Sequence, residues 1–277
     1  MELLPFSVAG GSVPGTEHTK PGQPGWTNNQ DAFAWSQVPG ALAAVVCDGC
    51  GGAPKSEVGS QLAAPFIALR LAELCRSMSV DEALLLVNLQ LKNFLSATAN
   101  HLAHSVHDVP NIAGDYFLFT VLGVVMTPER TVIFEAGDGV YAVNGEVVCI
   151  PPYPDNAPPY LGHRLTGWYP QEKIGIRIRA DLPTAKVNTI LIGTDGVADA
   201  IAVADELLPG KRQGEVFGPI QQFVENDLFV RNPDAIRRRL ALANRELVDG
   251  EHIKKGLLPD DTTLVVVQRR IEGGSNA

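Results

Sequence analysis

Residues 41–52 read ALAAVVCDGCGG, and this stretch decides the fold. Its first seven residues are all apolar and have the length of a buried strand. Asp48 follows at once, and three glycines come within the next four residues, a composition that continues neither a strand nor a helix. We therefore predict a buried strand that ends at an aspartate, then a loop, then a helix that begins near Ser56.

Two helices with apolar faces are predicted after this loop. The first has apolar side chains three to four residues apart from Leu62 to Leu74. The second begins near Ser79, where Ser-Val-Asp-Glu resembles a capping box, and continues through Leu95. Each helix is therefore expected to cover a sheet.

Hairpin signals dominate the rest of the chain. Turns are expected at Thr127-Pro128-Glu129-Arg130 and at Asn144-Gly145, the strongest short hairpin signal. Residues 199–250 are expected to be mostly helical. Hairpins imply antiparallel sheets, and no dinucleotide-binding G-x-G-x-x-G appears, which disfavours a Rossmann fold. The expected strands are 41–47, 116–126, 131–136, 141–143, 146–150, 186–192 and 261–269.

The composition is that of a globular protein with an acidic surface. The chain has 277 residues, of which 45% are hydrophobic, and its net charge is −9. This balance argues against a nucleic-acid partner, which needs clustered Lys and Arg. No apolar run approaches the roughly 20 residues of a membrane span, and Glu2 and Pro5 do not suit a signal peptide. We expect one cytoplasmic domain over 1–277, with an extended arm over 1–25, a flexible tail over 271–277 and no membrane partner.

Two motifs suggest other metal chemistry and are weaker. Cys47 and Cys50 form a C-x-x-C, but no second pair follows as a zinc site requires, and no helix opens there as a redox motif requires. His101, His104 and His107 recur at intervals of three without the carboxylate of a zincin motif. This pattern favours polar decoration of a helix.

Four aspartates are expected to gather at one edge of the sheets. Asp48, Asp138 and Asp195 each follow a predicted strand within three residues, and Asp260 directly precedes one. In an antiparallel sheet the start of one strand lies beside the end of its neighbour. Like charges this close repel unless a cation neutralises them, and carboxylate oxygens suit Mg²⁺ or Mn²⁺. Each Asp-Gly alone is typical of a turn, but together they predict a two-metal hydrolytic site.

Five short motifs occur in a fixed order along the chain. They are Asn29-Gln30-Asp31-Ala32, residues 46–52 with Gly59 following, Gly137-Asp138-Gly139, residues 194–199, and Asp260-Asp261-Thr262-Thr263. In this order they resemble the PPM, or type 2C, metal-dependent Ser/Thr protein phosphatases, and the chain looks like a divergent, bacterial-like member. Thr120 also falls where that family has a threonine on a core strand. The resemblance implies an α+β fold, a four-layer α-β-β-α sandwich of two antiparallel sheets flanked by helices.

The resemblance also implies a role for each aspartate at the metal site. Asp48 would bridge two Mg²⁺ or Mn²⁺ ions, and the Gly49 carbonyl would add a ligand. Asp195 and Asp260 would complete the shell of the first metal. The implied reaction is hydrolysis of phosphoserine and phosphothreonine in proteins by a water that the two metals activate.

Three further matched positions lie beside this core. Gln30 would be a ligand of the second metal, although the family usually has a glutamate there, and an amide oxygen supplies no charge. Asp31 would hold a water bound at the metals and belongs, with Asp48, Asp195 and Asp260, to the catalytic set. Asp138 would contribute to a third, weaker metal position.

Two substitutions affect the expected handling of phosphate. Cys50 stands where eukaryotic members have a histidine that can protonate the leaving group, although many bacterial members have methionine. Trp26 stands where the family has an arginine that binds the phosphate. An indole lacks the paired N–H donors with which a guanidinium group binds phosphate. Lys20 or Lys55 could bind the phosphate instead, or neither reaches the site.

Two other functions therefore stay open. Trp26 and Gln30 are compatible with a catalytically impaired, phosphatase-like binding or regulatory protein. The missing arginine also leaves room for a phosphatase that acts on a small-molecule phosphoester. The retained aspartates favour an active phosphatase of protein substrates, and the sequence is silent on oligomeric state.

Overall fold

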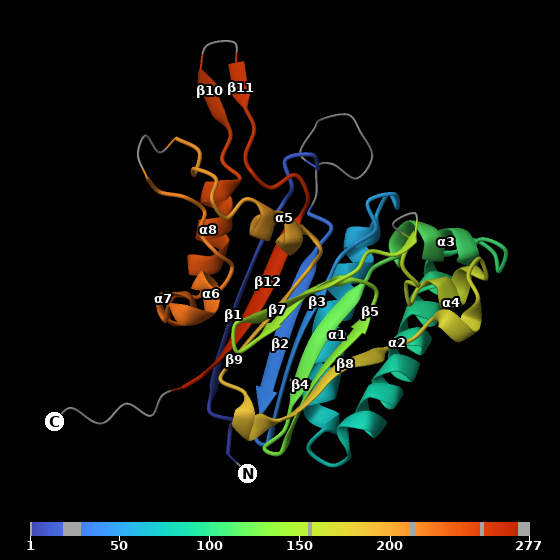
Figure 1. Ribbon diagram of the computed structural model, residues 1–277. Helices are drawn as coiled ribbons and strands as arrows, with labels where there is room; N and C mark the ends of the chain where they lie inside the picture. The colour runs from blue at the N-terminus through green and yellow to red at the C-terminus, as the bar shows by residue number, and fades with distance from the viewer. Residues whose placement is uncertain (1, 19–28, 155–156, 211–213, 250–251, 271–277) are drawn as a thin grey trace.

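Two antiparallel five-stranded sheets pack face to face between two groups of helices (Figure 1). The computed structural model describes residues 2–18, 29–154, 157–210, 214–249 and 252–270. Helices α1 to α4 lie on one side of the paired sheets and α5 to α8 on the other. This arrangement confirms the α+β, four-layer α-β-β-α sandwich expected from the sequence.

The first sheet has the order β1-β12-β9-β6-β7 and the second has the order β2-β3-β4-β5-β8. The strands of the first sheet are β1 (Phe6–Val13), β6 (Gly139–Val143), β7 (Glu146–Ile150), β9 (Thr189–Gly193) and β12 (Thr262–Arg269). Those of the second are β2 (Ala32–Val38), β3 (Ala41–Cys47), β4 (Val121–Met126), β5 (Arg130–Ala136) and β8 (Arg177–Pro183). A separate hairpin consists of β10 (Leu247–Asp249) and β11 (His252–Lys254). The helices are α1 (Ser56–Leu74), α2 (Val80–Leu102), α3 (Val109–Tyr116), α4 (His163–Thr166), α5 (Gly196–Ala202), α6 (Gln222–Glu225), α7 (Leu228–Arg231) and α8 (Ala235–Ala243), with short 3-10 turns at Gln171–Lys173 and Thr184–Lys186.

Strand β3 explains why the stretch that begins at residue 41 is apolar without a break. Ala43 and Val45 pack with α1 and α2, while Leu42 and Val46 face the first sheet. Because β3 lies between two neighbouring strands and between two layers, all seven of its side chains are buried. Alternation of polar and apolar residues is lost where both faces of a strand are covered.

Strand β1 lies within the segment that the sequence assigned to an extended arm. The sequence did not predict this strand, because its two central glycines lower β propensity. Both are required by close packing: a Cβ on Gly10 would come within 2.7 Å of the Phe33 ring, and one on Gly11 would come within 2.5 Å of the Arg237 backbone nitrogen. The expectation of an arm over 1–25 is therefore corrected for residues 6–13.

Other elements also differ from the sequence prediction. The strand expected over 116–126 begins only at Val121, because residues 109–116 form helix α3. Strands β2 and β8 were not predicted, since their side chains are mostly half-buried or exposed and carry no long apolar run. The tail over 271–277 lies outside the described residues. In the part of the chain that is described, no helix has the length and apolarity to cross a membrane.

The capping box at the start of α2 is present as predicted. The Ser79 hydroxyl accepts a hydrogen bond from the Glu82 backbone nitrogen at 3.3 Å, and the Ser79 backbone nitrogen donates to the Glu82 carboxylate at 3.0 Å. These two bonds satisfy N–H groups that a helix start otherwise leaves unpaired.

Replacing Ser79 with alanine should lower the free energy of unfolding by about 1 kcal/mol, because the cap is lost while the surrounding packing is unchanged. Urea denaturation of the variant would measure the loss. Ser77→Ala is the matched control, since the Ser77 hydroxyl only donates a 3.4 Å bond to the Leu74 carbonyl. Equal effects of the two substitutions would show that the cap is not the cause.

Candidate functional site

The four predicted aspartates line one pocket. Asp48, Asp138, Asp195 and Asp260 surround a cavity of about 190 Å³. The other lining residues are His18, Gly49, Cys50, Gly51, Pro158 and Tyr160. The sequence prediction that these strand ends meet is thus confirmed in space.

Strand register brings the aspartates together. The start of β12 pairs with the end of β9, where Leu264 lies opposite Gly193, so Asp260 and Asp195 approach each other. In the second sheet, the start of β2 pairs with the end of β3, where Ala32 lies opposite Cys47. This pairing places the Gln30-Asp31 segment beside Asp48, as antiparallel geometry requires.

The loop after β3 is held by hydrogen bonds and by close contact. The Asp48 backbone nitrogen donates to the Thr120 hydroxyl at 3.3 Å, and the Thr120 nitrogen donates to the Asp48 carbonyl at 2.8 Å. A Cβ on Gly49 would come within 2.6 Å of the Gln30 carbonyl oxygen and within 2.8 Å of the Ser56 hydroxyl. Only glycine allows the chain to pass here, so Asp48 depends on its glycine neighbour for its position.

Gln30 is buried with its amide held in one orientation. Its Nε2 donates to the Ser56 hydroxyl at 2.8 Å and to the Ala53 carbonyl at 3.2 Å. Its Oε1 is buried and has no hydrogen-bond partner within the described residues. A buried acceptor without a partner is costly, and this one lies near Gly51 in the pocket wall. Gln30 therefore presents a free oxygen of the kind that a hard cation accepts.

Asp31 lies behind the pocket and is not one of its lining residues. Its Oδ2 accepts a 2.8 Å hydrogen bond from the Thr194 hydroxyl, while Oδ1 is buried without a partner among the described residues. Burial, followed by the charge of Asp261, raises the pKa of Asp31 well above its usual range. Asp31 thus joins β2 to the loop after β9, 163 residues away in sequence.

Two residues of the site were not singled out from the sequence. Asp261 accepts hydrogen bonds from the backbone nitrogens of Gly15 and Gln30, both at 2.7 Å. His18 lies between neighbouring carboxylates, with Nε2 3.1 Å from Asp260 Oδ1 and Nδ1 3.2 Å from Asp261 Oδ2. Adjacency to Asp260 was a signal for Asp261, but nothing in the Gly- and Pro-rich segment pointed to His18.

The pocket carries strong electrostatic strain. Burial, followed by the charges of Asp260 and Asp138, raises the pKa of Asp195 to about 7. Burial and the charge of Asp195 raise the pKa of Asp48 well above its usual range. Hydrogen bonds to Asp260 and then Asp261 raise the pKa of His18 to about 10, which keeps its ring cationic at neutral pH. The site thus favours positive charge.

The carboxylates stand around the walls of the pocket. Across the described residues, no three His, Cys, Asp or Glu side chains converge into a ready-made metal cluster. The donor chemistry still suits a hard divalent cation, because four carboxylates line the pocket, and the unpartnered Gln30 oxygen lies behind Gly51 in its wall although Gln30 is not itself a lining residue. No lysine or arginine is found among the described residues that line it.

The two expected phosphate-binding lysines lie elsewhere or outside the described residues. The Lys55 ammonium donates to the Tyr116 hydroxyl and stands 4.7 Å from the centre of that ring, and Lys55 does not line the pocket. Lys20 and Trp26 lie outside the described residues. Cys50 lines the pocket beside Tyr160, whose pKa is raised by burial and by this cysteine.

The two alternative motifs gain no support from their surroundings. Cys47 is buried in β3 and Cys50 lines the pocket, and both thiols are free. His101, His104 and His107 are exposed, and α2 ends at Leu102, so only the first of them is on that helix.

Comparison with known proteins places the chain in a family. The protein phosphatase 2C family model matches residues 14–231. The serine/threonine phosphatase Stp1 from Staphylococcus aureus is 16% identical, with 99% of this chain and 98% of that one covered and a TM-score of 0.54. The catalytic domain of the serine/threonine protein phosphatase PstP, solved with two manganese ions, is 18% identical, with coverage of 95% and 97% and a TM-score of 0.53.

A structure of a bacterial serine phosphatase gives a TM-score of 0.56 at 15% identity, covering 95% of this chain and 98% of that one. At such identities the likeness of the structures shows the fold alone. No curated protein matches the sequence. Because the family model spans more than half of the sequence, this chain belongs to the protein phosphatase 2C family.

Proposed function

We propose that this chain is a metal-dependent phosphatase that removes phosphate from phosphoserine and phosphothreonine in proteins. The observation that carries the proposal is the pocket in which Asp48, Asp138, Asp195 and Asp260 meet at the ends of the two sheets. A site built from carboxylate oxygens in a family of phosphatases suits phosphoester hydrolysis assisted by a hard cation.

The proposed ligands are assigned to the residues as follows. Asp48, with the Gly49 carbonyl, Asp195 and Asp260, would hold the first ion, and Asp48 would also reach the second. The unpartnered oxygen of Gln30 supports its assignment to the second ion. When bound, Mg²⁺ or Mn²⁺ would activate water and stabilise the charge that develops on the phosphoryl group. The two manganese ions in the PstP domain support this choice of metals.

The surrounding residues would orient these groups. Asp31, which accepts a hydrogen bond from the Thr194 hydroxyl, would hold a water near the pocket, and Asp138 would contribute to a third, weaker position. His18 brings positive charge to the pocket wall. Asp261 ties the His18 segment and Gln30 to the start of β12, so it would position both rather than react.

The first test is metal-dependent turnover. With Mn²⁺ or Mg²⁺ the protein should release phosphate from both p-nitrophenyl phosphate and a phosphothreonine peptide. Asp48→Asn and Asp195→Asn should each lower kcat/KM by more than about 100-fold, since each removes a charged ligand. Asp227→Asn is the matched control, because Asp227 pairs with Arg231 on α7 and does not line the pocket.

The outcomes separate the three candidate functions. Turnover of the small ester alone would favour a phosphatase of small molecules. Metal binding measured by calorimetry, without turnover of any phosphoester, would favour a binding or regulatory protein. Absence of both metal binding and turnover would overturn the proposal.

A second prediction concerns stability without metal. Asp195→Asn should raise the free energy of unfolding in EDTA by at least about 1 kcal/mol at pH 8, because a buried, repelled charge is removed and one pKa unit is worth about 1.4 kcal/mol. Thermal unfolding of both proteins in EDTA and in Mn²⁺ would measure this. Mn²⁺ should raise the Tm of the wild type more than that of the variant. A less stable variant in EDTA would contradict the prediction.

The third prediction is a pH dependence with a fixed sign. The pKa of Asp195 is about 7 in the folded protein, above the value of about 4 in an unfolded chain. The folded state therefore binds more protons between these values, and stability in EDTA should fall as the pH rises from 4 to 7. Urea denaturation at several pH values in this range would measure this, and the free energy of unfolding should fall less with rising pH for Asp195→Asn than for the wild type. Equal slopes would show that Asp195 does not titrate in this way.

A further inference from the structure

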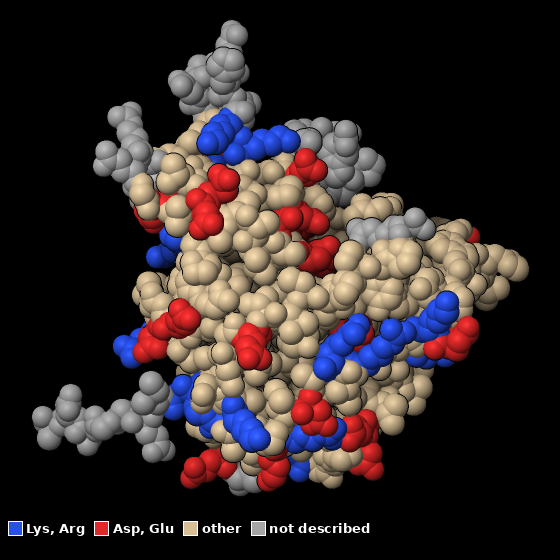
Figure 2. All heavy atoms as spheres, in the orientation of Figure 1, with Lys and Arg blue, Asp and Glu red and all other residues tan. Residues whose placement is uncertain are grey.

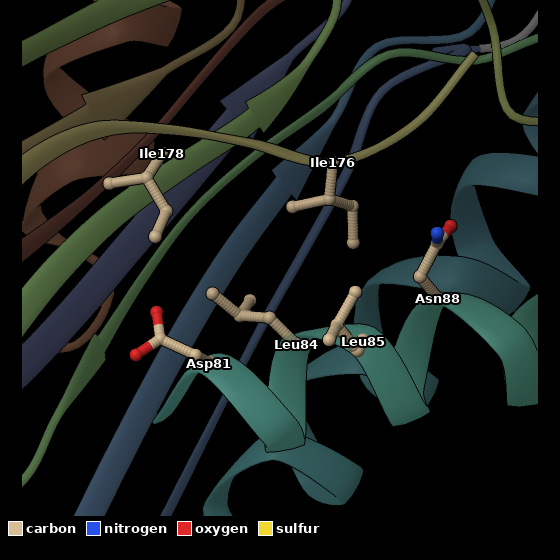
Figure 3. Close-up of a pocket in the computed structure, with 6 residues that line it drawn as sticks. All are labelled: Asp81, Leu84, Leu85, Asn88, Ile176 and Ile178. Atoms are coloured by element: carbon tan, nitrogen blue, oxygen red, sulfur yellow. The ribbon is translucent and has the colours of Figure 1, made fainter. Parts of the chain in front are cut away.

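Strand β8 forms an edge of the second sheet beside an apolar groove. No strand among the described residues pairs with its outer side. Figure 3 shows Ile176 and Ile178 pointing toward Leu84 and Leu85 of α2 across a cavity of about 240 Å³. A sheet edge with unpaired backbone groups is a template for an added strand.

The groove leaves large apolar side chains in solvent. Leu85 is 71% exposed, Leu89 one turn further along α2 is 53% exposed, and Ile178 is 44% exposed. Neighbouring exposed apolar groups of this kind mark interaction surfaces more often than isolated ones do. At the end of the groove, Arg130 pairs with both Asp81 at 2.6 Å and Asp181 of β8 at 2.9 Å, so the acidic charge there is confined to one corner of the surface.

The other face of β8 is cationic. Arg179 pairs with the buried Glu135 at 2.9 Å, and Arg177, which lies opposite Glu135 in the β5–β8 register, contacts the Tyr153 hydroxyl and the Lys173 carbonyl. Two guanidinium groups thus share the Glu135 carboxylate, which leaves this end of β8 with a net positive charge. Figure 2 shows a band of Lys and Arg side chains on the side of the molecule where β8 and α2 lie in Figure 1, although the chain carries a net charge of −9.

We propose that the outer edge of β8 binds an extended segment of a partner protein in which apolar and acidic residues alternate. Side chains of an added strand point alternately to the two faces of the sheet. Those on the helix side would enter the groove next to Leu85 and Ile178, and those on the other side would meet Arg177. The chemistry of the edge thus specifies both the charge and the period of the segment.

A second copy of this chain is a poorer occupant. Pairing of two β8 edges would set Arg177 and Arg179 of one molecule against the same residues of the other, and like charges across strands are destabilising. Edge charges, Pro183 and the bulge opposite Ile133 and Phe134 also hinder unspecific pairing. These devices do not account for the exposed leucines, which a partner with apolar side chains would cover.

The test uses three labelled peptides of one length: alternating Val and Asp, the same residues in two blocks, and alternating Val and Lys. Fluorescence anisotropy with the full-length protein should show binding of the Val–Asp peptide and at least about tenfold weaker binding of the other two. Leu85→Asp and Arg177→Glu should each weaken binding of the Val–Asp peptide by about tenfold. Arg177→Glu should also bind the Val–Lys peptide more tightly than the wild type does.

The matched control is Arg231→Glu, an exposed charge reversal on α7 in the opposite helix layer, and it should leave binding unchanged. Hydrogen exchange of residues 177–182 should slow when the Val–Asp peptide is added, as strand addition requires. Equal binding of the alternating and block peptides, or unchanged exchange in β8, would overturn the proposal. Because no step is a turnover assay, failure here is independent of failure of the proposed phosphatase activity.

Discussion

Mutual repulsion among buried carboxylates is the constraint on which the rest of the structure depends. The antiparallel register brings Asp48, Asp195 and Asp260 to one small pocket, and burial makes the charges of Asp48 and Asp195 costly. Asp48 and Asp195 follow β3 and β9 within two residues, and Asp260 precedes β12 by two, so the pairing of these strands sets where the aspartate backbones lie. The strand pairing that brings the charges together also keeps the carboxylate oxygens around the pocket.

Much of this arrangement was accessible from the sequence because it follows from simple rules. The unbroken apolar run from residue 41 predicted a buried strand, and the capping box at Ser79 located the start of α2. The position of Asp260 before a strand, rather than after one, was enough to predict that it shares an edge with the other three aspartates. These predictions succeeded because each depends on a short run of consecutive residues: an apolar run, a capping box, or an aspartate next to a predicted strand.

The remaining parts depend on contacts between distant segments, which leave no local trace. The glycines of β1 lower its β propensity, and only the packing of Phe33 and α8 against them explains their presence. His18 gains its charge from two aspartates more than 240 residues away in sequence. Lys55 looked available to bind phosphate, yet it stacks on Tyr116 because α3, which was not foreseen, follows at the end of the helical layer.

The contacts of Asp261 with Gly15, His18 and Gln30 have a consequence for folding during translation. Residues 15, 18 and 30 are synthesised more than 200 residues before Asp261, the carboxylate that contacts them, and Asp261 directly precedes β12, which lies between β1 and β9. Until that strand arrives, the first sheet is divided and the acidic pocket lacks a wall. The pocket therefore assembles only after β12 has been synthesised, however early its other walls are made.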